Sequence, residues 1–462
     1  RDAFQETDVL GVTQPVTKHN FLVQKVEDLA DIVHEAFRLA LAGRPGPVLI
    51  DVPKDVQFAK TLYHPSAPVI ATKHSGVSQA ATPSAKALTQ AAQLIAEAQR
   101  PVIMSGHGVI LSNAYNELRA FAEKTNIPVI TTLLGLSAFP ETHPLAIGMP
   151  GMHGPAHVNR AIGVTDLIIG VGLRFDDRVT GKASEFAPHA RIIHIDIDPS
   201  EMHKVKYAAV PIVSDAKVAL AALTDAVEPG DHSVWINEVR DWEARDNQRT
   251  ASISRSQQYP DPISILEAIR EETRGEAIIV SDVGQHQMWT ARYYTWTRPN
   301  SHITSGGLGT MGFALPAAMG VKMGMPDTTV WVVAGDGGIQ MNIQELATLR
   351  QEGVTLKVAI MNNGFLGMVR QWQHFFHAGN YSETPISGPD YVKLADAYGL
   401  TGMCITRRED VREAIQKAMQ IEGTVIIDFV IESESNVYPM VAPGSAITNM
   451  IEETEEEHAG HD

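Results

Sequence analysis

The sequence predicts an α/β protein built on parallel sheets, because short Val/Ile-rich runs alternate with amphipathic stretches along most of the chain. Several of these apolar runs end directly in Gly, Asp or Asn. Ligands of open parallel sheets bind just beyond the carboxyl ends of the strands, so this placement predicts binding sites there. The length of 462 residues corresponds to about three domains of ordinary size.

The expected strands follow in chain order as residues 47–52, 101–105, 166–171, 191–195, 277–281, 329–334, 356–361 and 424–430. Two polar stretches without periodicity, about 65–83 and 245–262, are expected to be linkers. They divide the chain into predicted domains 1–78, 79–245 and 258–462. The first block is too short for an α/β domain, so we expect it to be the end of a domain that begins before Arg1.

Composition excludes two classes of partner. The chain carries 54 acidic and 37 basic residues, and its net charge of −17 repels both nucleic-acid phosphates and anionic membrane surfaces. No apolar run approaches the ~20 residues of a spanning helix, which predicts a soluble protein. A single cysteine, Cys404, cannot form an internal disulfide, so we expect a reducing, cytoplasmic location.

Two motifs in the third block suggest a metal site. The strand at 329–334 breaks into Gly335-Asp336-Gly337-Gly338, and the strand at 356–361 breaks into Asn362-Asn363-Gly364. A helical pattern at about 342–351 separates them, so Asp336 and Asn363 should emerge at the same sheet edge. One carboxylate and one amide oxygen suit Mg²⁺ bound to a diphosphate. Each motif alone would more often be a simple turn.

A dinucleotide fingerprint, Gly307-x-Gly309-x-x-Gly312, offers a competing interpretation in which Asp336 would bind a ribose. The Pro-Asn-Ser-His segment at 299–302 is not expected to form the strand that this fingerprint requires. Two further glycines after Asp336 also have no purpose in a ribose site. We therefore do not expect nicotinamide binding there.

The middle block contains three strand ends rich in Gly or acid: Gly106-His107-Gly108, the turn from Gly172 to Asp176, and Asp196-Ile197-Asp198. Such ends can form a dinucleotide crevice, in which an acid binds ribose hydroxyls or an adenine amine. They can equally be ordinary turns. The residues alone leave both interpretations open.

Longer motifs narrow the choice. They are Val283-Gly284-Gln285-His286-Gln287-Met288-Trp289, Ser305-Gly306-Gly307-Leu308-Gly309-Thr310-Met311-Gly312, Leu366-Gly367-Met368-Val369-Arg370-Gln371-Trp372, Gly43-Arg44-Pro45-Gly46-Pro47-Val48, Val52-Pro53-Lys54-Asp55, Gly151-Met152-His153-Gly154 and Arg174-Phe175-Asp176-Asp177-Arg178-Val179-Thr180-Gly181-Lys182. In this order they closely resemble the catalytic subunit of the acetohydroxyacid synthase (acetolactate synthase) family of thiamine-diphosphate enzymes. The resemblance covers essentially the whole chain and implies a partial pyrimidine-binding domain, a central FAD-binding domain and a diphosphate-binding domain.

The resemblance implies the cofactor ligands residue by residue. Asp336, Asn363 and the backbone carbonyl of Phe365 would hold Mg²⁺. The residues implied to line thiamine diphosphate are Gln285, His286, Gly309, Thr310, Met311, Asp336, Gly337, Gly338, Asn363, Leu366, Gly367 and Met368. Gly364 and Phe365 differ from the usual family residues, but any residue can supply a carbonyl ligand. Met311 is either a prop for the cofactor or a core methionine.

A structural FAD is implied in the middle block, since the overall reaction needs no redox step. The matching positions are Arg44, Gly106, His107, Thr132, Leu133, Met152, His153, Gly172, Arg174, Asp176, Arg178, Asp196, Ile197 and Asp215. His107 stands where the family commonly has Gly. This difference puts the closest backbone approach to FAD in question.

The residues assigned to the substrate pocket are Phe4, Gln5, Lys54, Arg178, Met368 and Trp372. Arg178 would grip the carboxylate of a 2-keto acid, although Arg178 and Lys54 can also be plain surface cations. Met368 and Trp372 lie four residues apart and would share a helix face, either as pocket wall or as a core stripe.

The implied activity is acetolactate synthesis in the biosynthesis of isoleucine, valine and leucine. Pyruvate is decarboxylated, and its two-carbon unit passes to a second 2-keto acid, pyruvate or 2-oxobutyrate. The family's activating Glu belongs to the first part of the pyrimidine-binding domain. We expect that part to precede Arg1, so that this chain alone is incomplete as an enzyme.

The implied assembly is a homodimer or homotetramer, joined by a small regulatory subunit. Two alternatives stay open from the sequence. One is another FAD-containing thiamine enzyme, such as glyoxylate carboligase or pyruvate oxidase. The other is a truncated cofactor-binding protein without catalytic activity.

Overall fold

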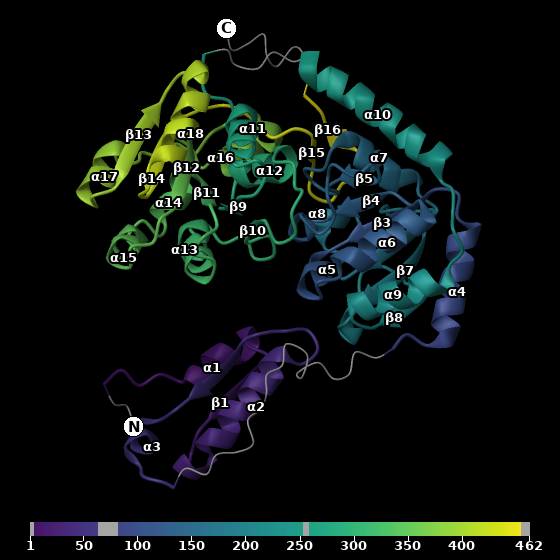
Figure 1. Ribbon diagram of the computed structural model, residues 1–462, viewed down its shortest axis with the longest axis horizontal. Helices are drawn as coiled ribbons and strands as arrows, with labels where there is room; N and C mark the ends of the chain where they lie inside the picture. The colour runs from purple at the N-terminus through teal and green to yellow at the C-terminus, as the bar shows by residue number, and fades with distance from the viewer. Residues whose placement is uncertain (1–3, 63–81, 253–257, 454–462) are drawn as a thin grey trace.

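The computed structural model describes residues 4–62, 82–252 and 258–453, with the side chains of 249–252 left out. Two large parallel sheets lie side by side, and a smaller N-terminal unit lies beneath them in Figure 1. The prediction of an α/β fold with parallel sheets is confirmed. No helix among the described residues is long and apolar enough to cross a membrane.

The middle sheet has six parallel strands in the order β5-β4-β3-β6-β7-β8. Its strands are β3 (Pro101–Ser105), β4 (Val129–Thr131), β5 (Ala146–Gly148), β6 (Leu167–Val171), β7 (Arg191–Asp196) and β8 (Val210–Val213). Its helices are α4 (Ala85–Glu97), α5 (His107–Leu111), α6 (Tyr115–Thr125), α7 (Ala156–Val164), α8 (Asp177–Thr180), α9 (Ala216–Ala226) and α10 (Ser233–Ser252). Short 3₁₀ turns lie at Leu133–Gly135 and Pro199–Glu201.

The C-terminal sheet also has six parallel strands, in the order β10-β9-β11-β12-β14-β13. Its strands are β9 (Ile278–Ser281), β10 (His302–Thr304), β11 (Val330–Gly335), β12 (Lys357–Asn362), β13 (Thr401–Ile405) and β14 (Val425–Val430). Its helices are α11 (Pro262–Glu272), α12 (Gln285–Tyr293), α13 (Ala314–Gly324), α14 (Asp336–Gln340), α15 (Glu345–Gln351), α16 (Gly367–Phe376), α17 (Tyr391–Ala397) and α18 (Val411–Gln420). A two-stranded antiparallel pair, β15 (Met440–Val441) and β16 (Met450–Ile451), follows.

The N-terminal unit is a two-stranded parallel sheet with short helices. It contains α1 (Val9–Thr13), β1 (His19–Leu22), α2 (Leu29–Leu41), β2 (Val48–Asp51) and α3 (Lys54–Phe58). Several of its apolar side chains are exposed, among them Val16 at 70% and Phe58 at 76%.

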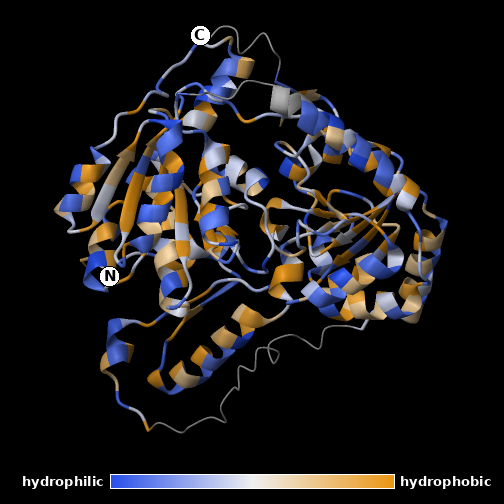
Figure 2. Cartoon of the chain, turned by 45° about the horizontal axis from the view of Figure 1, so that its top comes forward, coloured by the Kyte–Doolittle hydropathy of each residue, from blue (hydrophilic) through white to orange (hydrophobic). Residues whose placement is uncertain are grey.

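Both large sheets are buried on both faces, which explains why their central strands are continuous apolar runs. Alternate residues of β3 illustrate the pleat: Ile103 enters one core cluster, and Val102 and Met104 enter the cluster on the other face. In β11, Trp331 and Val333 face one cluster while Val332 faces the other. Figure 2 shows these strands in orange between helices that carry much of the blue, hydrophilic colour.

The helix expected at about 342–351 is present as α15, which begins at Glu345, and a further short helix, α14, begins at Asp336 itself. Two other expectations about local structure were wrong. Residues 302–304 do form a strand, β10, at the sheet edge beside β9. The stretch from 245 is helical to Ser252 because α10 continues through it and packs on α7. The first expected linker lies almost wholly outside the described residues.

A buried carboxyl joins the two large sheets. Glu141, between β4 and β5, donates its N–H to the Trp296 carbonyl at 2.8 Å, and the Trp296 N–H donates to Glu141 Oε2 at 2.8 Å. Burial raises the pKa of Glu141 to about 8, although the Trp296 N–H and the Arg270 charge act in the opposite direction. The protonated form therefore fits this junction best.

The raised pKa of Glu141 predicts that stability falls as pH rises toward 8. A folded-state pKa above the unfolded value favours folding at low pH, and that contribution is lost progressively as pH rises from the ordinary glutamate value of 4.5 to about 8. The midpoint of thermal unfolding should therefore fall by a few degrees between about pH 6 and about pH 8, and Glu141→Gln should flatten this decline. Circular dichroism melts measure it, with the exposed Glu228→Gln as control. An identical decline in both variants would contradict the assignment.

Candidate functional site

The carboxyl ends of β11 and β12 bring the two predicted metal ligands together. The strands are parallel neighbours, with Gly335 opposite Met361, so Asp336 and Asn363 follow at the same edge. Asp336 Oδ2 accepts a hydrogen bond from the Gly364 N–H at 3.1 Å, and Asn363 Oδ1 accepts one from the Phe365 N–H at 3.1 Å. The Asp336 carboxylate and the Asn363 amide thus follow neighbouring strand ends and contact the same loop, and oxygen groups of these kinds are the ligands that Mg²⁺ prefers.

Asp336 is almost fully buried, at 3% exposure, on the first turn of α14. Burial raises the pKa of Asp336 to about 6, although hydrogen bonds from backbone N–H groups of its own turn and of Gly364 lower it. In the described part of the chain no salt bridge to Asp336 is present, so a cation beside this carboxylate would offset the cost of burying its charge.

Gln285 and His286 begin α12 and pack against the same turn. Gln285 Oε1 accepts a hydrogen bond from Asn363 Nδ2 at 3.1 Å. A Cβ added to Gly367 would lie 2.1 Å from that Gln285 oxygen, so any larger residue there would displace the Gln285 amide. Burial lowers the pKa of His286 below its usual range, and its buried Nε2 has no hydrogen-bond partner among the described residues. An unsatisfied buried nitrogen beside this turn fits a site completed by a polar ligand.

The glycine-rich segment 305–312 is anchored by Asp282, which sequence reasoning missed. Asp282 is 1% exposed and accepts hydrogen bonds from the N–H groups of Gly312 at 2.9 Å and Ala314 at 3.1 Å. A Cβ on Gly338 would lie 2.9 Å from the same carboxylate. Asp282 therefore sets the spacing between this segment and α14. The sequence did contain a signal for this role, because Asp282 stands at the end of a buried strand and directly before the motif that begins at Val283.

The order of the strands in the C-terminal sheet bears on the alternative that the glycines at 307–312 bind a nicotinamide dinucleotide. A strand does precede Gly306, contrary to expectation, but β10 is a three-residue edge strand whose neighbour is β9. Asp336 follows β11, one strand further away. A ribose-binding acid belongs at the end of the strand beside the glycine-rich turn, so the order opposes a nicotinamide site there.

One large cleft of about 1520 Å³ is lined by residues of the N-terminal unit, the middle domain and the C-terminal domain. This exceeds the roughly 300–1,000 Å³ of common small-molecule pockets and leaves room for a dinucleotide-sized ligand beside a second one. The predicted site residues that line it are Arg44, His107, Thr132, Leu133, Met152, His153, Gly172, Arg174, Asp176, Arg178, Asp196, Ile197, Asp215, Gly309, Met311, Met368 and Trp372.

Other predicted residues do not line this cleft. One group of them lies at the ends of β11 and β12 and at the start of α12, as described above: Asp336, Gly337, Gly338, Asn363, Phe365, Leu366, Gly367, Gln285 and His286. Gly106 and Thr310 lie beside lining residues in the sequence. Phe4, 92% exposed, Gln5 and Lys54 lie elsewhere on the N-terminal unit, with Lys54 Nζ 5.9 Å from the Phe58 ring. The structure therefore does not bring these three together with the rest.

Two turns at the cleft floor pack backbone against backbone. A Cβ on Gly106 would lie 2.4 Å from the Gly172 carbonyl oxygen, and a Cβ on Gly108 would lie 2.5 Å from the Gly172 Cα. The close packing of these two turns therefore requires glycine at these positions, whether or not a ligand binds. The His107 Nδ1 lies 3.0 Å from the Leu134 carbonyl oxygen.

We expect Gly172→Ala to destabilise the middle domain by about 1–3 kcal/mol from backbone strain alone. Its φ of +58° is unfavourable for alanine, and the added Cβ would clash with Gly108. Chemical denaturation measures the change in the free energy of unfolding. Gly320→Ala in α13, where an added Cβ meets nothing within 4 Å, is the matched control. Equal stability of the two variants would contradict the packing argument.

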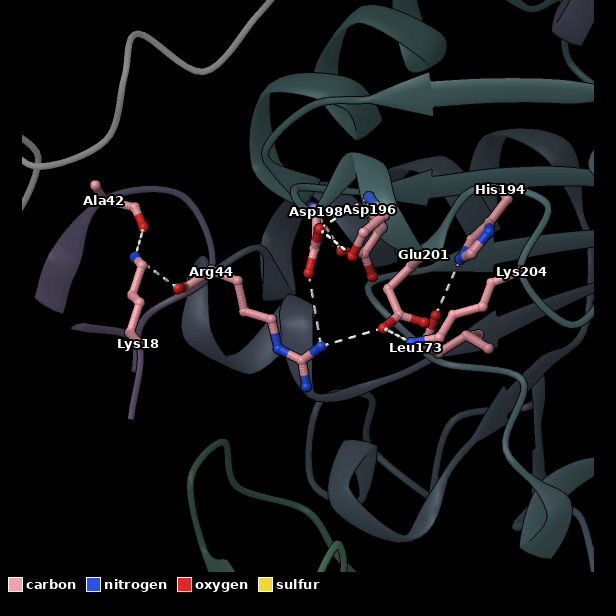
Figure 3. Close-up of polar contacts among 10 residues, drawn as sticks. Lys18, Ala42, Arg44, Leu173, His194, Asp196, Asp198, Glu201 and Lys204 are labelled. Carbon is pink, nitrogen blue, oxygen red and sulfur yellow. Dashed lines mark hydrogen bonds and ion pairs between the residues drawn. The ribbon is translucent and has the colours of Figure 1, made fainter. Parts of the chain in front are cut away.

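Acidic side chains gather where β7 ends. Asp196 accepts a hydrogen bond from the Asp198 N–H at 2.9 Å, and burial raises the pKa of Asp196. Figure 3 shows Arg44 reaching this cluster from the N-terminal unit: its Nη1 lies 3.3 Å from Glu201 and 3.8 Å from Asp198. Lys204 Nζ also pairs with Glu201 at 2.9 Å. Arg44 thus connects the N-terminal unit to the cleft mouth.

Cations and a helix face complete the cleft wall. Arg178 Nη1 lies 3.1 Å from Asp177 with 59% of its side chain exposed, and Arg174 lies 3.8 Å from Asp176. Opposite them, α16 presents Met368 and Trp372 on one half-buried face. The Trp372 ring is held edge-on by Phe376, at 5.7 Å between ring centroids.

Comparison with known proteins identifies the family of this chain. The family model of the thiamine pyrophosphate enzyme central domain matches residues 88–223, and the model of the C-terminal TPP binding domain matches residues 282–429. The chain is similar to the acetolactate synthase large subunit of Corynebacterium glutamicum, with 46% identity over 96% of this chain and 72% of that protein. It is also similar to the isozyme 2 large subunit of Escherichia coli, with 41% identity over 98% of this chain and 80% of that protein. The chain therefore belongs to the acetolactate synthase family of thiamine-diphosphate enzymes.

Proposed function

We propose that this acetolactate synthase binds thiamine diphosphate through Mg²⁺ held by Asp336, Asn363 and the backbone carbonyl of Phe365. The observation that carries the proposal is the convergence of these groups at the ends of β11 and β12, with Asp336 nearly buried. A magnesium ion would offset the negative charge of both the carboxylate and the diphosphate, which lowers the free-energy cost of burying them.

The turns around this metal site suit a diphosphate. A Cβ on Gly337 would lie 3.0 Å from Leu366 and 3.1 Å from Ile386, so the backbone of α14 and the turn before α16 approach closely. We assign Gln285, His286, Gly309, Thr310, Met311, Gly367 and Met368 to the same cofactor. When bound, thiamine diphosphate supplies the nucleophilic carbon and the electron sink that decarboxylation of a 2-keto acid requires.

The protein's own groups would orient the substrates. Arg178 offers a planar guanidinium at the cleft wall, and such a fork binds a carboxylate with two parallel hydrogen bonds. Met368 and Trp372 supply an apolar wall that excludes water. We propose that these residues hold pyruvate or 2-oxobutyrate as the acceptor of the two-carbon unit, in the biosynthesis of branched-chain amino acids.

We further propose that FAD occupies the middle-domain part of the cleft as a structural cofactor. The support is the cleft volume, the close glycine turns at its floor and the acidic cluster at the end of β7. Asp215 also lines it, and it is held by Ser112 Oγ at 2.7 Å while it caps α9. His153 fits as well, since its buried Nδ1 has no hydrogen-bond partner among the described residues.

The proposal includes assembly with other chains. Two of the relatives above are called large subunits, which supports a small regulatory subunit as partner. We propose a homodimer or homotetramer of this chain in addition. Light scattering with and without the cognate small subunit measures both.

An assay of the full gene product tests the function. Purified protein should form acetolactate from pyruvate only when thiamine diphosphate and Mg²⁺ are present, and formation should decline after FAD is removed. Chelation of Mg²⁺ should abolish cofactor binding in calorimetry. Acetolactate formation that persists without Mg²⁺ would refute the metal assignment, and formation that persists without FAD would refute the FAD assignment.

A further inference from the structure

Arg370 is a fully buried cation on α16, between two residues of the cleft wall. Its exposure is 0%, and it lies two positions from both Met368 and Trp372. In the described part of the chain no carboxylate lies within ion-pair distance of its guanidinium. A buried charge is costly unless hydrogen bonds satisfy it, so its neutral partners show what this residue does.

Those partners lie in one short segment. Arg370 Nη2 donates to the Glu434 carbonyl at 2.9 Å, the Ser435 carbonyl at 2.8 Å and Asn436 Oδ1 at 2.6 Å. Its Nη1 donates to the Tyr381 hydroxyl at 3.3 Å. Three of the four hydrogen bonds of this guanidinium therefore go to residues 434–436, and losing it would remove those three restraints on the segment.

Gln371, the next residue, holds the same segment. Its Oε1 accepts hydrogen bonds from the Val437 N–H at 2.7 Å and from Gln285 Nε2 at 2.9 Å. Gln285 Nε2 also donates to the Ser435 carbonyl at 2.7 Å. Consecutive side chains of α16, together with the start of α12, thus fasten residues 435–437 beside the candidate metal site.

Residues 434–447, here called the strap, run from α16 to the other wall of the cleft. The Val441 N–H donates to the Met152 carbonyl at 2.8 Å, and the Lys182 N–H donates to the Ser445 carbonyl at 2.9 Å. Ile447, 1% exposed, belongs to the core of the middle domain. Figure 1 shows β15 and β16 beside α7 and β5 of that domain.

The far end of the strap holds a turn that lines the cleft. The Met152 N–H donates to the Arg178 carbonyl at 2.9 Å, so Met152 links the strap to Arg178. Met152 and Arg178 face the same cleft as Met368 and Trp372. The strap therefore connects the two walls, with Arg370 at one end and Met152 at the other.

We propose that Arg370 is a positioning residue for acetolactate synthesis. By holding the near end of the strap against α16, it sets the separation between Trp372 and the Met152–Arg178 turn, and thereby the fit of the second 2-keto acid. This inference rests on the proposed assignment of these residues to the acceptor pocket. It concerns placement of the walls, since Arg370 itself does not line the cleft.

The test compares Arg370→Met, which keeps the apolar bulk, with Arg370→Lys, which keeps the charge. Arg370→Met should raise KM for pyruvate about 10-fold or more, because small misplacements of binding groups are costly. The ratio of 2-oxobutyrate-derived to pyruvate-derived product should change as well, while affinity for thiamine diphosphate changes little. Arg370→Lys should restore part of both values, and Asn436→Ala should shift them in the same direction as Arg370→Met. Arg412→Met, an exposed arginine of α18 paired with Glu271, is the control.

Hydrogen exchange gives a readout independent of activity. Protection of the Val441 and Lys182 amides should fall in Arg370→Met and Asn436→Ala, while protection within α6 stays unchanged. Unchanged product ratios and unchanged protection in folded, active variants would overturn the positioning role. A wild-type protein that forms no acetolactate would instead refute the proposed function. Failure of Arg370→Met to fold leaves Asn436→Ala to decide.

Discussion

Replacing Asp336 by alanine is expected to weaken Mg²⁺-dependent binding of thiamine diphosphate by more than about 100-fold, because loss of even an outer-shell partner costs roughly 10–100-fold in metal affinity. Asp336 is the one charged group among the proposed metal ligands. Without it, the proposed metal site at the ends of β11 and β12 would keep only neutral ligands to offset the charge of the diphosphate. Isothermal titration calorimetry with thiamine diphosphate, with and without Mg²⁺, measures the effect.

Two variants make the Asp336 result interpretable. Asp336→Asn keeps the size and the acceptor for the Gly364 N–H but removes the charge, so it should bind almost as poorly as the alanine variant. Asp396→Ala removes an exposed carboxylate of α17 and should bind normally. Unchanged cofactor affinity in folded Asp336→Ala would defeat the metal assignment.

Replacing Trp372 by leucine should leave acetolactate formation largely intact while lowering the preference for 2-oxobutyrate as acceptor. The indole ring lines the cleft and is supported by Phe376, so it can contact the additional methyl group of the larger acceptor. One methylene in an apolar pocket is worth about 1–3 kcal/mol of discrimination, so the product ratio should change by about 10-fold or more.

Competition assays with both 2-keto acids measure the Trp372 effect. Trp242→Leu is a suitable control, because Trp242 packs on Trp235 in the middle domain, at 5.8 Å between ring centroids, and does not line the cleft. An unaltered product ratio in Trp372→Leu would mean that this ring does not shape the acceptor pocket.

The central strands of both sheets could be predicted closely from the sequence. β3, β6, β7, β9, β11, β12 and β14 begin and end within one residue of the expected limits. Both faces of these strands are buried, so most of their residues are apolar, and several of them end in Gly, Asp or Asn. The same property made the Asp336 and Asn363 motifs visible, because each follows such a run.

Edge strands could not be predicted in the same way. β13 has partly exposed side chains at the edge beside β14, and β10 is only His-Ile-Thr beside β9. An edge strand gains its backbone hydrogen bonds from its neighbour, so its own residues need not be apolar or β-branched. Sequence patterns therefore contain little trace of such strands.

The sequence by itself determined the α/β class, the family and the residue types available for chemistry, since these depend on local patterns and motif order. Only the tertiary structure decided which distant residues act together. Asp282 reaches Gly312 and Ala314, Arg44 reaches Glu201, and Arg370 reaches residues 434–436 through side-chain contacts that no spacing encodes. Such contacts depend on how whole elements pack, because a buried charge or carboxyl takes its partners from whichever backbone groups the fold places beside it.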